Sequence, residues 1–197
     1  LPICRLAKKY FVVHGSDLGK PQLRQCLDAA DKTFVRSHAL ARQLKDNYDV
    51  EPSGVVYSGI DAAEIIDLQS KDISLEGGLV ITMASLMIPR KNVQPCLRAF
   101  RALVDQGVRL TVHLYGDGPL SEAITRDIEQ LGLTRVVRQY GFTPRAEVLK
   151  AMRASHLFLM PSVQETFGLV YLEAMASGCV VIGHQGWGID GVVEEGV

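Results

Sequence analysis

Short apolar runs that are rich in β-branched residues alternate with amphipathic stretches along the chain. Their length and composition are typical of strands that are buried on both faces of a sheet. They occupy residues 10–14, 33–36, 55–57, 79–84, 110–115, 136–140, 157–160 and 180–183. We predict a strand at each of these runs.

Between the runs, apolar residues recur three or four positions apart. Residues 93–106 carry Leu97, Phe100 and Leu103 at this spacing, and residues 120–131 carry a similar set that includes Ile124. Such spacing places the apolar side chains on one face of a helix. Strands that alternate with helices predict an α/β fold in which helices cover both faces of a parallel sheet.

The alternation stops between residues 61 and 78. This stretch contains a polar run at residues 67–72, and the pair Gly77-Gly78 comes just before the strand at residues 79–84. Polar and glycine-containing stretches of this kind join domains. We therefore predict two lobes, residues 1–68 and 78–197, with a hinge at residues 69–77.

The composition is that of an ordinary globular protein, with 47% hydrophobic and 22% charged residues. No charged leader precedes a long apolar run, so we expect neither a signal peptide nor a membrane span, and we expect a cytoplasmic protein. The four cysteines are far apart and lack the C-x-x-C spacing, which favours reduced thiols.

Charge is distributed unevenly. Residues 1–50 carry nine Lys and Arg against five Asp and Glu, whereas the whole chain has a net charge of −1. This basic segment is consistent either with contact to an anionic membrane or an acidic acceptor, or with ordinary solvated charge.

Candidate chemistry follows several predicted strands, where ligands bind in open α/β sheets. Arg90 and Lys91 stand where two cations could meet a pyrophosphate, although such a pair also serves solubility. Gly116 opens a tight turn that either contacts substrate or is turn chemistry alone. His14 ends a strand before a Gly-Ser-Asp turn, where it is either a site residue or a core or capping histidine.

The loop at residues 161–168 leads into an apolar stretch that we predict to be a buried helix. Glu173 interrupts this helix, and a carboxylate there is costly unless it is hydrogen-bonded, meets a polar ligand or lies on a wet edge. Glu165 lies in the loop. The free amides at the helix N-terminus favour phosphate binding, and they belong to Thr166, Phe167, Gly168 and Leu169.

Other chemistry is not supported. Residues 186–191 spell G-x-G-x-x-G, but a match without the surrounding βαβ unit is weak, and we do not assign a dinucleotide site. The chain has no G-x-S-x-G or H-E-x-x-H motif, and its five histidines lack metal-ligand spacing.

Taken together, the residues at the strand ends resemble the group 1 family of retaining glycosyltransferases, and the resemblance covers nearly the whole chain. Residues 13–17, 56–61 and 115–119 resemble three of its motifs. Residues 161–162, 165–168 and 172–178 are more specific, because they match the paired-glutamate donor signature.

The resemblance implies a GT-B fold of two Rossmann-like lobes. Residues 1–68 would be the C-terminal part of the acceptor lobe, which would be only partly present. Residues 78–197 would be the donor-binding lobe, incomplete at its C-terminus. On this basis we expect a fragment that binds a nucleoside diphosphate without efficient turnover.

The resemblance also implies roles for single residues. Glu165, with the amides of Phe167, Gly168 and Leu169, would hold the donor sugar and the β-phosphate. Glu173 would accept hydrogen bonds from the ribose hydroxyls.

Three further roles come from the same source. Lys91 would neutralise the pyrophosphate, the backbone near Phe142 would lie beside the nucleobase, and His14 would contact the transferred sugar.

The implied reaction transfers a sugar from a nucleotide-sugar donor to an acceptor hydroxyl with retention, in polysaccharide or glycolipid biosynthesis. We expect no cofactor, no metal and no nucleic acid. The acceptor would be a glycan, a glycolipid or a small molecule, and the remainder of the acceptor lobe could contact the cytoplasmic face of a membrane.

The chain departs from the family pattern at two positions. Ala84-Ser85 stands where the family usually has Gly-Arg, which removes a phosphate-binding cation that Arg90 would have to replace, and Asn92 stands at a common glycine. Two alternatives therefore stay open, a catalytically degenerate nucleotide-binding module and a GT-B nucleotide-sugar epimerase.

Overall fold

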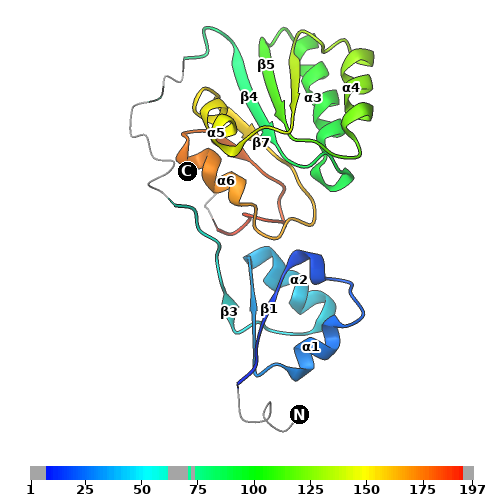
Figure 1. Ribbon diagram of the computed structural model, residues 1–197, viewed down its shortest axis with the longest axis vertical. Coiled ribbons are helices and arrows are strands. Elements are labelled where there is room, and N and C mark those ends of the chain that lie inside the picture. The colour runs from blue at the N-terminus through cyan, green and yellow to red at the C-terminus, as the bar shows by residue number, and fades with distance from the viewer. Residues whose placement is uncertain (1–7, 62–70, 72–73, 193–197) are drawn as a thin grey trace. The chain divides into compact units, whose positions relative to one another are not determined.

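The computed structural model describes residues 8–61, 71 and 74–192, in which strands alternate with helices (Figure 1). These residues divide into two compact units. The first unit holds the described residues up to Ser58, Gln164–Gly168 and those from Gln185 onward, and the second holds the described residues of Gly59–Val163 and Leu169–His184. The predicted α/β class is confirmed.

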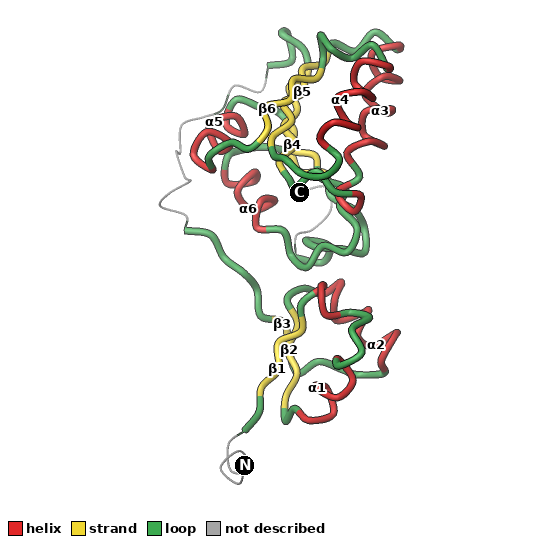
Figure 2. Tube along the Cα trace, turned by 45° about the vertical axis from the view of Figure 1, so that its right-hand side comes forward, coloured by secondary structure: helices red, strands yellow, loops and turns green. Residues whose placement is uncertain are grey.

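Three short parallel strands form the sheet of the first unit. In the order β1-β2-β3 they are β1 (Tyr10–Val13), β2 (Lys32–Val35) and β3 (Gly54–Val55). The helices α1 (Leu23–Ala29) and α2 (His38–Tyr48) connect them and lie on one side of the sheet (Figures 1 and 2). The core between the helices and the sheet comprises Val13, Leu23, Leu27, Val35, Leu40 and Leu44.

Helix α2 has a polar cap at its start and an apolar face. The side-chain hydroxyl of Ser37 accepts a hydrogen bond from the backbone N–H of Leu40 at 3.2 Å, which satisfies one of the unpaired donors of the first turn. Leu40 and Leu44 lie four residues apart and are buried, so both face the sheet. The opposite side of the helix leaves polar side chains available to solvent or ligand.

Five parallel strands form the sheet of the second unit, in the order β6-β5-β4-β7-β8. They are β4 (Leu79–Ala84), β5 (Leu110–Tyr115), β6 (Val137–Gly141), β7 (Leu157–Leu159) and β8 (Val180–Ile182). The chain proceeds outward from β4 to β5 and β6, and then returns to the other side of β4 with β7 and β8. The carboxyl end of β4 is therefore a topological switch point, where open α/β sheets bind ligands.

Helices cover both faces of this sheet. Helices α3 (Val93–Asp105) and α4 (Ser121–Gln130) lie on one face, and α5 (Arg145–Arg153) and α6 (Leu169–Ala176) lie on the other (Figures 1 and 2). The main core lies on the side of α3 and α4, where Ile81, Met83 and Leu114 are at most 3% exposed. On the other side, the buried hydroxyls of Thr82 and Ser155 pair at 2.7 Å.

The predicted strands at residues 79–84 and 110–115 are confirmed at their bounds. Most others shift by one or two residues, and the third shifts most: residues 55–57 were predicted, whereas β3 is Gly54–Val55. The reason is that a strand extends only as far as its partner, and β2, which pairs with β3, ends at Val35. Beyond that point Tyr57 is 50% exposed, and its hydroxyl hydrogen-bonds to His38.

The bounds of the predicted lobes stay a prediction. Residues 69, 70, 72 and 73 of the predicted hinge lie outside the described residues. The two units separate after Ser58, and the first unit includes Gln164–Gly168, which the sequence had suggested to be part of the second lobe.

Helix α6 is less buried than its apolar sequence suggests. Tyr171 and Ala174 are buried, whereas Leu169 is 41% exposed, because α6 packs against α5 and β8 on part of its surface only. In the described parts of the chain, no helix is both long and apolar enough to cross a membrane.

Candidate active site

A pocket of about 260 Å³ lies at the carboxyl ends of β4 and β5, at the switch point of the second unit. It is lined by Ala84, Ser85, Leu86, Tyr115, Gly116, Asp117, Phe142, Thr143 and Val148. Gly116 and Phe142, both predicted from the sequence as site residues, are thus brought together. Phe142 is 85% exposed, so its side chain offers an apolar surface to a flat ligand.

Gly116 lets two loops approach closely. Its φ is +113°, and a Cβ atom there would lie 1.9 Å from the carbonyl oxygen of Ser85. The Ser85 N–H donates to the carbonyl of Tyr115 at 3.1 Å, which holds the loop after β4 against the end of β5. The glycine at this turn is therefore a steric requirement of the pocket floor.

Asp117 stabilises the same turn. Its carboxylate accepts hydrogen bonds from the hydroxyl of Ser121 at 2.5 Å and from the N–H of Gly118 at 2.7 Å. These two bonds lower the pKa of the Asp117 carboxyl below its usual value. The turn thus presents a negative charge beside the pocket.

Lys91 and Arg90 lie in the short 3-10 helix Pro89–Lys91 that follows the loop after β4. Lys91 is only 8% exposed, and its ammonium nitrogen lies 3.8 Å from the sulfur of Met160, a weak acceptor. Buried lysines are rare because burying the charge is costly. Burial argues against a role for Lys91 in solubility alone.

The segment around Lys91 is joined to the loop after β7. Asn92 has a left-handed backbone, with φ +54°, and its side-chain amide donates to the carbonyl of Pro161 at 2.8 Å. The N–H of Val163 donates to the carbonyl of Arg90 at 2.9 Å. Asn tolerates the left-handed conformation better than most residues, which explains why it can stand at a position where the resemblance leads us to expect glycine.

Glu173 has a partner that the sequence analysis missed. Its carboxylate, 16% exposed, accepts a hydrogen bond from the guanidinium of Arg145 at 2.7 Å. Arg145 is the first residue of α5, and in the sequence it lies 28 positions away with no motif around it. An ionised carboxylate accepts several hydrogen bonds, so the pairing leaves capacity for hydroxyl donors of a ligand.

His14, Glu165, Thr166, Phe167 and Gly168 belong to the first unit. The N–H of Gly15 donates to the hydroxyl of Thr166 at 3.0 Å, and a Cβ atom on Gly15 would lie 2.8 Å from that oxygen. The strand end that carries His14 is therefore held against the loop that carries Glu165. His14 and Glu165, which we predict to contact the transferred sugar and to act as the catalytic residues, are each next to one partner of this hydrogen bond.

His14 itself is exposed, and its backbone is fixed by Asp17. The N–H of His14 donates to the carboxylate of Asp17 at 2.9 Å. Partial burial alone would raise the pKa of the Asp17 carboxyl, but the hydrogen bonds and charges of Lys20 and His14 outweigh it, and the pKa is lowered. Asp17 is thus a charged backbone anchor that leaves the imidazole exposed.

The loop before α6 presents unused backbone donors. Within the described residues, the amides of Thr166, Phe167 and Gly168 have no hydrogen-bond acceptor. The N–H of Gly188 donates to the carbonyl of Glu165 at 3.0 Å. The glycine-rich stretch at residues 186–191 therefore supports the Glu165 loop.

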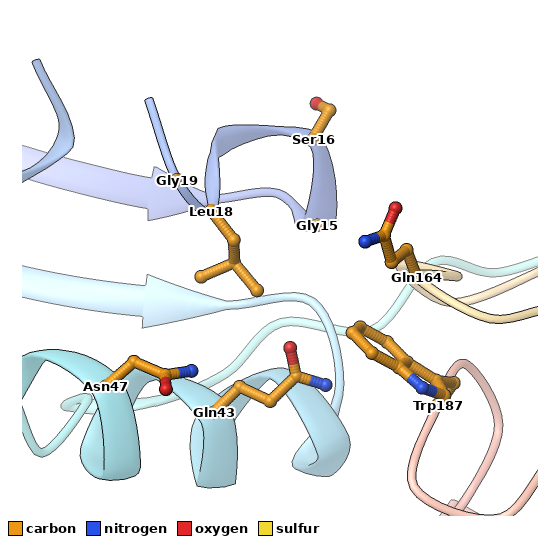
Figure 3. A pocket seen from close by; sticks show the side chains of 8 residues that line it. All are labelled: Gly15, Ser16, Leu18, Gly19, Gln43, Asn47, Gln164 and Trp187. Carbon is orange, nitrogen blue, oxygen red and sulfur yellow. The ribbon is translucent and has the colours of Figure 1, made fainter. Parts of the chain in front are cut away.

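A second pocket, of about 380 Å³, lies within the first unit (Figure 3). Its lining residues are Gly15, Ser16, Leu18, Gly19, Gln43, Asn47, Gln164 and Trp187. None of the side chains that line this pocket is among the site residues predicted from the sequence. The only signal in the sequence is the spacing of Gln43 and Asn47, which places both on one face of α2.

Within the described residues, no group of three or more His, Cys, Asp and Glu side chains could hold a metal ion. The predicted donor-binding residues Arg90, Lys91, Gly116, Phe142, Leu169 and Glu173 all belong to the second unit.

Comparison with known proteins identifies the family. Residues 66–197 match the family described as glycosyl transferases group 1. The chain is 30% identical over 191 residues to D-inositol 3-phosphate glycosyltransferase of Corynebacterium glutamicum, covering 88% of this chain and 45% of that protein. It is 29% identical over 201 residues to N-acetyl-alpha-D-glucosaminyl L-malate synthase of Bacillus anthracis, covering 93% and 51%.

The chain thus spans about half the length of these curated relatives. Among solved structures, Anabaena HepE in complex with UDP and glucose matches 99% of this chain and 57% of its own, with a TM-score of 0.74 and 21% identity. This likeness shows the fold. The chain therefore has a GT-B fold and belongs to the group 1 glycosyltransferase family.

Proposed function

We propose that the protein transfers a sugar from a nucleoside diphosphate sugar to an acceptor hydroxyl with retention of configuration. The bond between the anomeric carbon and the β-phosphate oxygen breaks, and a bond from that carbon to the acceptor oxygen forms. The departing phosphate oxygen takes the acceptor proton, and the nucleoside diphosphate leaves. The proposed reaction uses no metal, because protein cations and amides balance the charge of the leaving group.

The pocket at the end of β4 carries this proposal. It lies where open α/β sheets bind nucleotides, and the exposed ring of Phe142 offers a face on which a nucleobase can stack. Gly116 allows the backbone of the pocket floor to approach a ligand closely. We assign this pocket to the base of the donor.

Glu173 is assigned to the ribose. Two neighbouring hydroxyls are donors that match a carboxylate, and the partner Arg145 holds that carboxylate in one orientation. A degenerate module would not need a largely buried glutamate at this position, which is why we favour a working donor site.

Lys91 and Arg90 are assigned to the pyrophosphate. A buried ammonium interacts with a phosphate more strongly than a solvated one, because there is less screening around it. The stronger interaction of Lys91 compensates for the missing cation at Ser85, where the family usually has an arginine. The amides of Thr166, Phe167, Gly168 and Leu169 add neutral donors for the β-phosphate.

Glu165 and His14 are assigned to the transferred sugar. Glu165 accepts hydrogen bonds from its hydroxyls, and the exposed imidazole of His14 contacts it near the reacting carbon. Their neighbours Thr166 and Gly15 form the hydrogen bond that supports both positions.

Calorimetric titration with UDP, GDP and ADP tests the donor site, and UDP comes first because the similar HepE structure contains it. We expect one nucleotide to bind. Glu173→Ala and Phe142→Ala should each weaken that nucleotide by about 1–3 kcal/mol, or roughly 5- to 150-fold. Lys91→Met, which replaces the buried lysine with an uncharged, unbranched side chain of similar size, should weaken nucleotide binding to a similar extent.

Matched controls are available in the second unit. Glu147→Ala removes an exposed carboxylate that pairs with Lys150, and Lys150→Met removes the partner. Neither should change nucleotide affinity. If no nucleotide binds to folded protein, or if the control and site variants are equally affected, the donor-site assignment is wrong.

A second experiment tests the type of reaction. Product analysis by NMR with and without an acceptor separates retaining transfer from epimerisation.

A further inference from the structure

The pocket of the first unit has a lining without charged side chains. Its side-chain polar groups are the amides of Gln43, Asn47 and Gln164, the hydroxyl of Ser16 and the indole N–H of Trp187, and Leu18 supplies an apolar surface (Figure 3). Its volume of about 380 Å³ lies within the range of about 300–1,000 Å³ for small-molecule sites. The lining therefore selects for a small, uncharged and polar ligand.

Amide side chains match the hydrogen-bonding character of sugar hydroxyls. Each amide donates through nitrogen and accepts through oxygen, as each hydroxyl both donates and accepts. In Figure 3 the amides of Gln43 and Gln164 lie beside the indole ring of Trp187. An aromatic face next to hydroxyl partners suits a saccharide ring, whose faces carry C–H groups and whose rim carries hydroxyls.

The Trp187 segment is held in place before any ligand arrives. The carboxylate of Asp190 accepts a hydrogen bond from the N–H of Gly186 at 2.8 Å and also pairs with Arg42 of α2. The side-chain amide of Gln43 reaches the carbonyl of Gly186 at 3.4 Å. A preorganised site loses less conformational entropy on binding.

The opposite wall is also fixed. The N–H of Gly19 donates to the hydroxyl of Tyr48 at 2.8 Å, and Asp17 binds both Lys20 and the backbone of His14. The charge of Asp17 is therefore engaged within its own turn. A phosphate or carboxylate in the pocket would lose its hydration without a cationic partner in the lining.

We propose that this pocket binds an uncharged saccharide ring, stacked on Trp187 and hydrogen-bonded by Gln43, Asn47 and Gln164, as the acceptor of the transfer reaction. The role of this saccharide as the acceptor rests on the proposed function, whereas the binding of a saccharide in this pocket does not. It distinguishes this protein from the two relatives above, whose names give an inositol phosphate and malate as substrates.

Trp187 is the single tryptophan of the 197 residues, so intrinsic fluorescence reports on this pocket directly. The protein is titrated with a panel of neutral methyl glycosides and disaccharides, and with glucose 6-phosphate and malate as charged probes. We expect a saturable fluorescence change and reduced acrylamide quenching with at least one neutral saccharide. The charged probes should produce neither.

Variants test the lining. Gln43→Ala and Asn47→Ala should each weaken the neutral saccharide roughly 5- to 10-fold, because each removes one partner of a hydrogen bond. Gln25→Ala, an exposed glutamine on α1, is the matched control and should have no effect. Calorimetry shows whether Trp187→Phe retains binding that Trp187→Ala loses.

The outcomes separate this inference from the proposed function. Nucleotide binding without any saturable response to neutral saccharides, or with a response to the charged probes instead, overturns the saccharide site. Saccharide binding that depends on Gln43 and Trp187, without binding of any nucleotide, keeps the site and removes the donor function. Transfer to the bound saccharide from the nucleotide sugar supports both.

Discussion

The pocket at the ends of β4 and β5 and the pocket beside α2 differ in how far apart in the sequence their lining residues lie. The first is built from strand ends and the loops that follow them, within residues 84–148. The second combines residues 15–47 with Gln164 and Trp187. A sheet topology therefore fixes the first pocket, whereas long-range packing assembles the second.

The largest expected effect tests the topological pocket. Gly116→Ala should destabilise the protein by about 4 kcal/mol or more, because the new Cβ would collide with the backbone of Ser85 at a positive φ. Urea denaturation followed by circular dichroism measures the change. Gly107→Ala is the control, since its φ is +83° with no atom within 4 Å, and it should cost about 1 kcal/mol. Equal losses in both variants would show that strain alone matters.

A smaller effect tests the assembled pocket. Gly15→Ala should cost about 1–3 kcal/mol, because its Cβ would meet the hydroxyl of Thr166, a side chain that can move. Thr166→Ala should restore part of this loss by removing the obstacle. Urea denaturation of the variant that carries both Gly15→Ala and Thr166→Ala shows whether the second substitution restores stability. Strictly additive losses would mean that Gly15 and Thr166 do not contact each other in solution.

Chemical labelling of the cysteines compares how accessible to solvent the thiols of the two units are. At pH 8, in a Cys4→Ser variant, Cys26 of α1 should react with iodoacetamide rapidly, and the buried Cys96 and Cys179 only on unfolding. Mass spectrometry of peptides reports each site. Rapid labelling of Cys96 in folded protein would contradict the packing of α3 against the sheet.

The buried thiol of Cys96 predicts that the stability of the fold depends on pH. Burial raises the pKa of Cys96 to about 11 from an ordinary value of 9.0. Between these values the folded state keeps a proton that the unfolded chain releases. The stabilising contribution is thus fully present below pH 9 and is lost as pH rises toward 11. Cys96→Ala should flatten this decline in urea midpoints.

The smallest effect concerns Arg145, whose side chain is 48% exposed. Arg145→Ala should change stability by only about 0.2–1 kcal/mol, because water screens an exposed pair. It should nevertheless weaken nucleotide binding more than it weakens folding, if it orients Glu173. Calorimetry beside urea denaturation compares the two, and an unchanged nucleotide affinity would assign Arg145 to surface charge alone.

Sequence pattern alone determined the α/β class, the strands at residues 79–84 and 110–115, and the strand-end position of Gly116, whereas Phe142 came from the family resemblance. It did so because buried parallel strands and the turns that follow them are coded locally. The family resemblance added the roles of Glu165, Glu173 and Lys91, which stay predictions. The burial of Lys91 could not be predicted from the sequence, because an Arg-Lys pair is typical of an exposed surface.

Tertiary structure decided the contacts between distant residues. The partnership of Arg145 with Glu173, the contact of Gly15 with Thr166, and the pocket of Gln43, Asn47 and Trp187 depend on how separate segments pack. No local period encodes these distances, because side chains far apart in the chain meet only after the sheets and helices have formed.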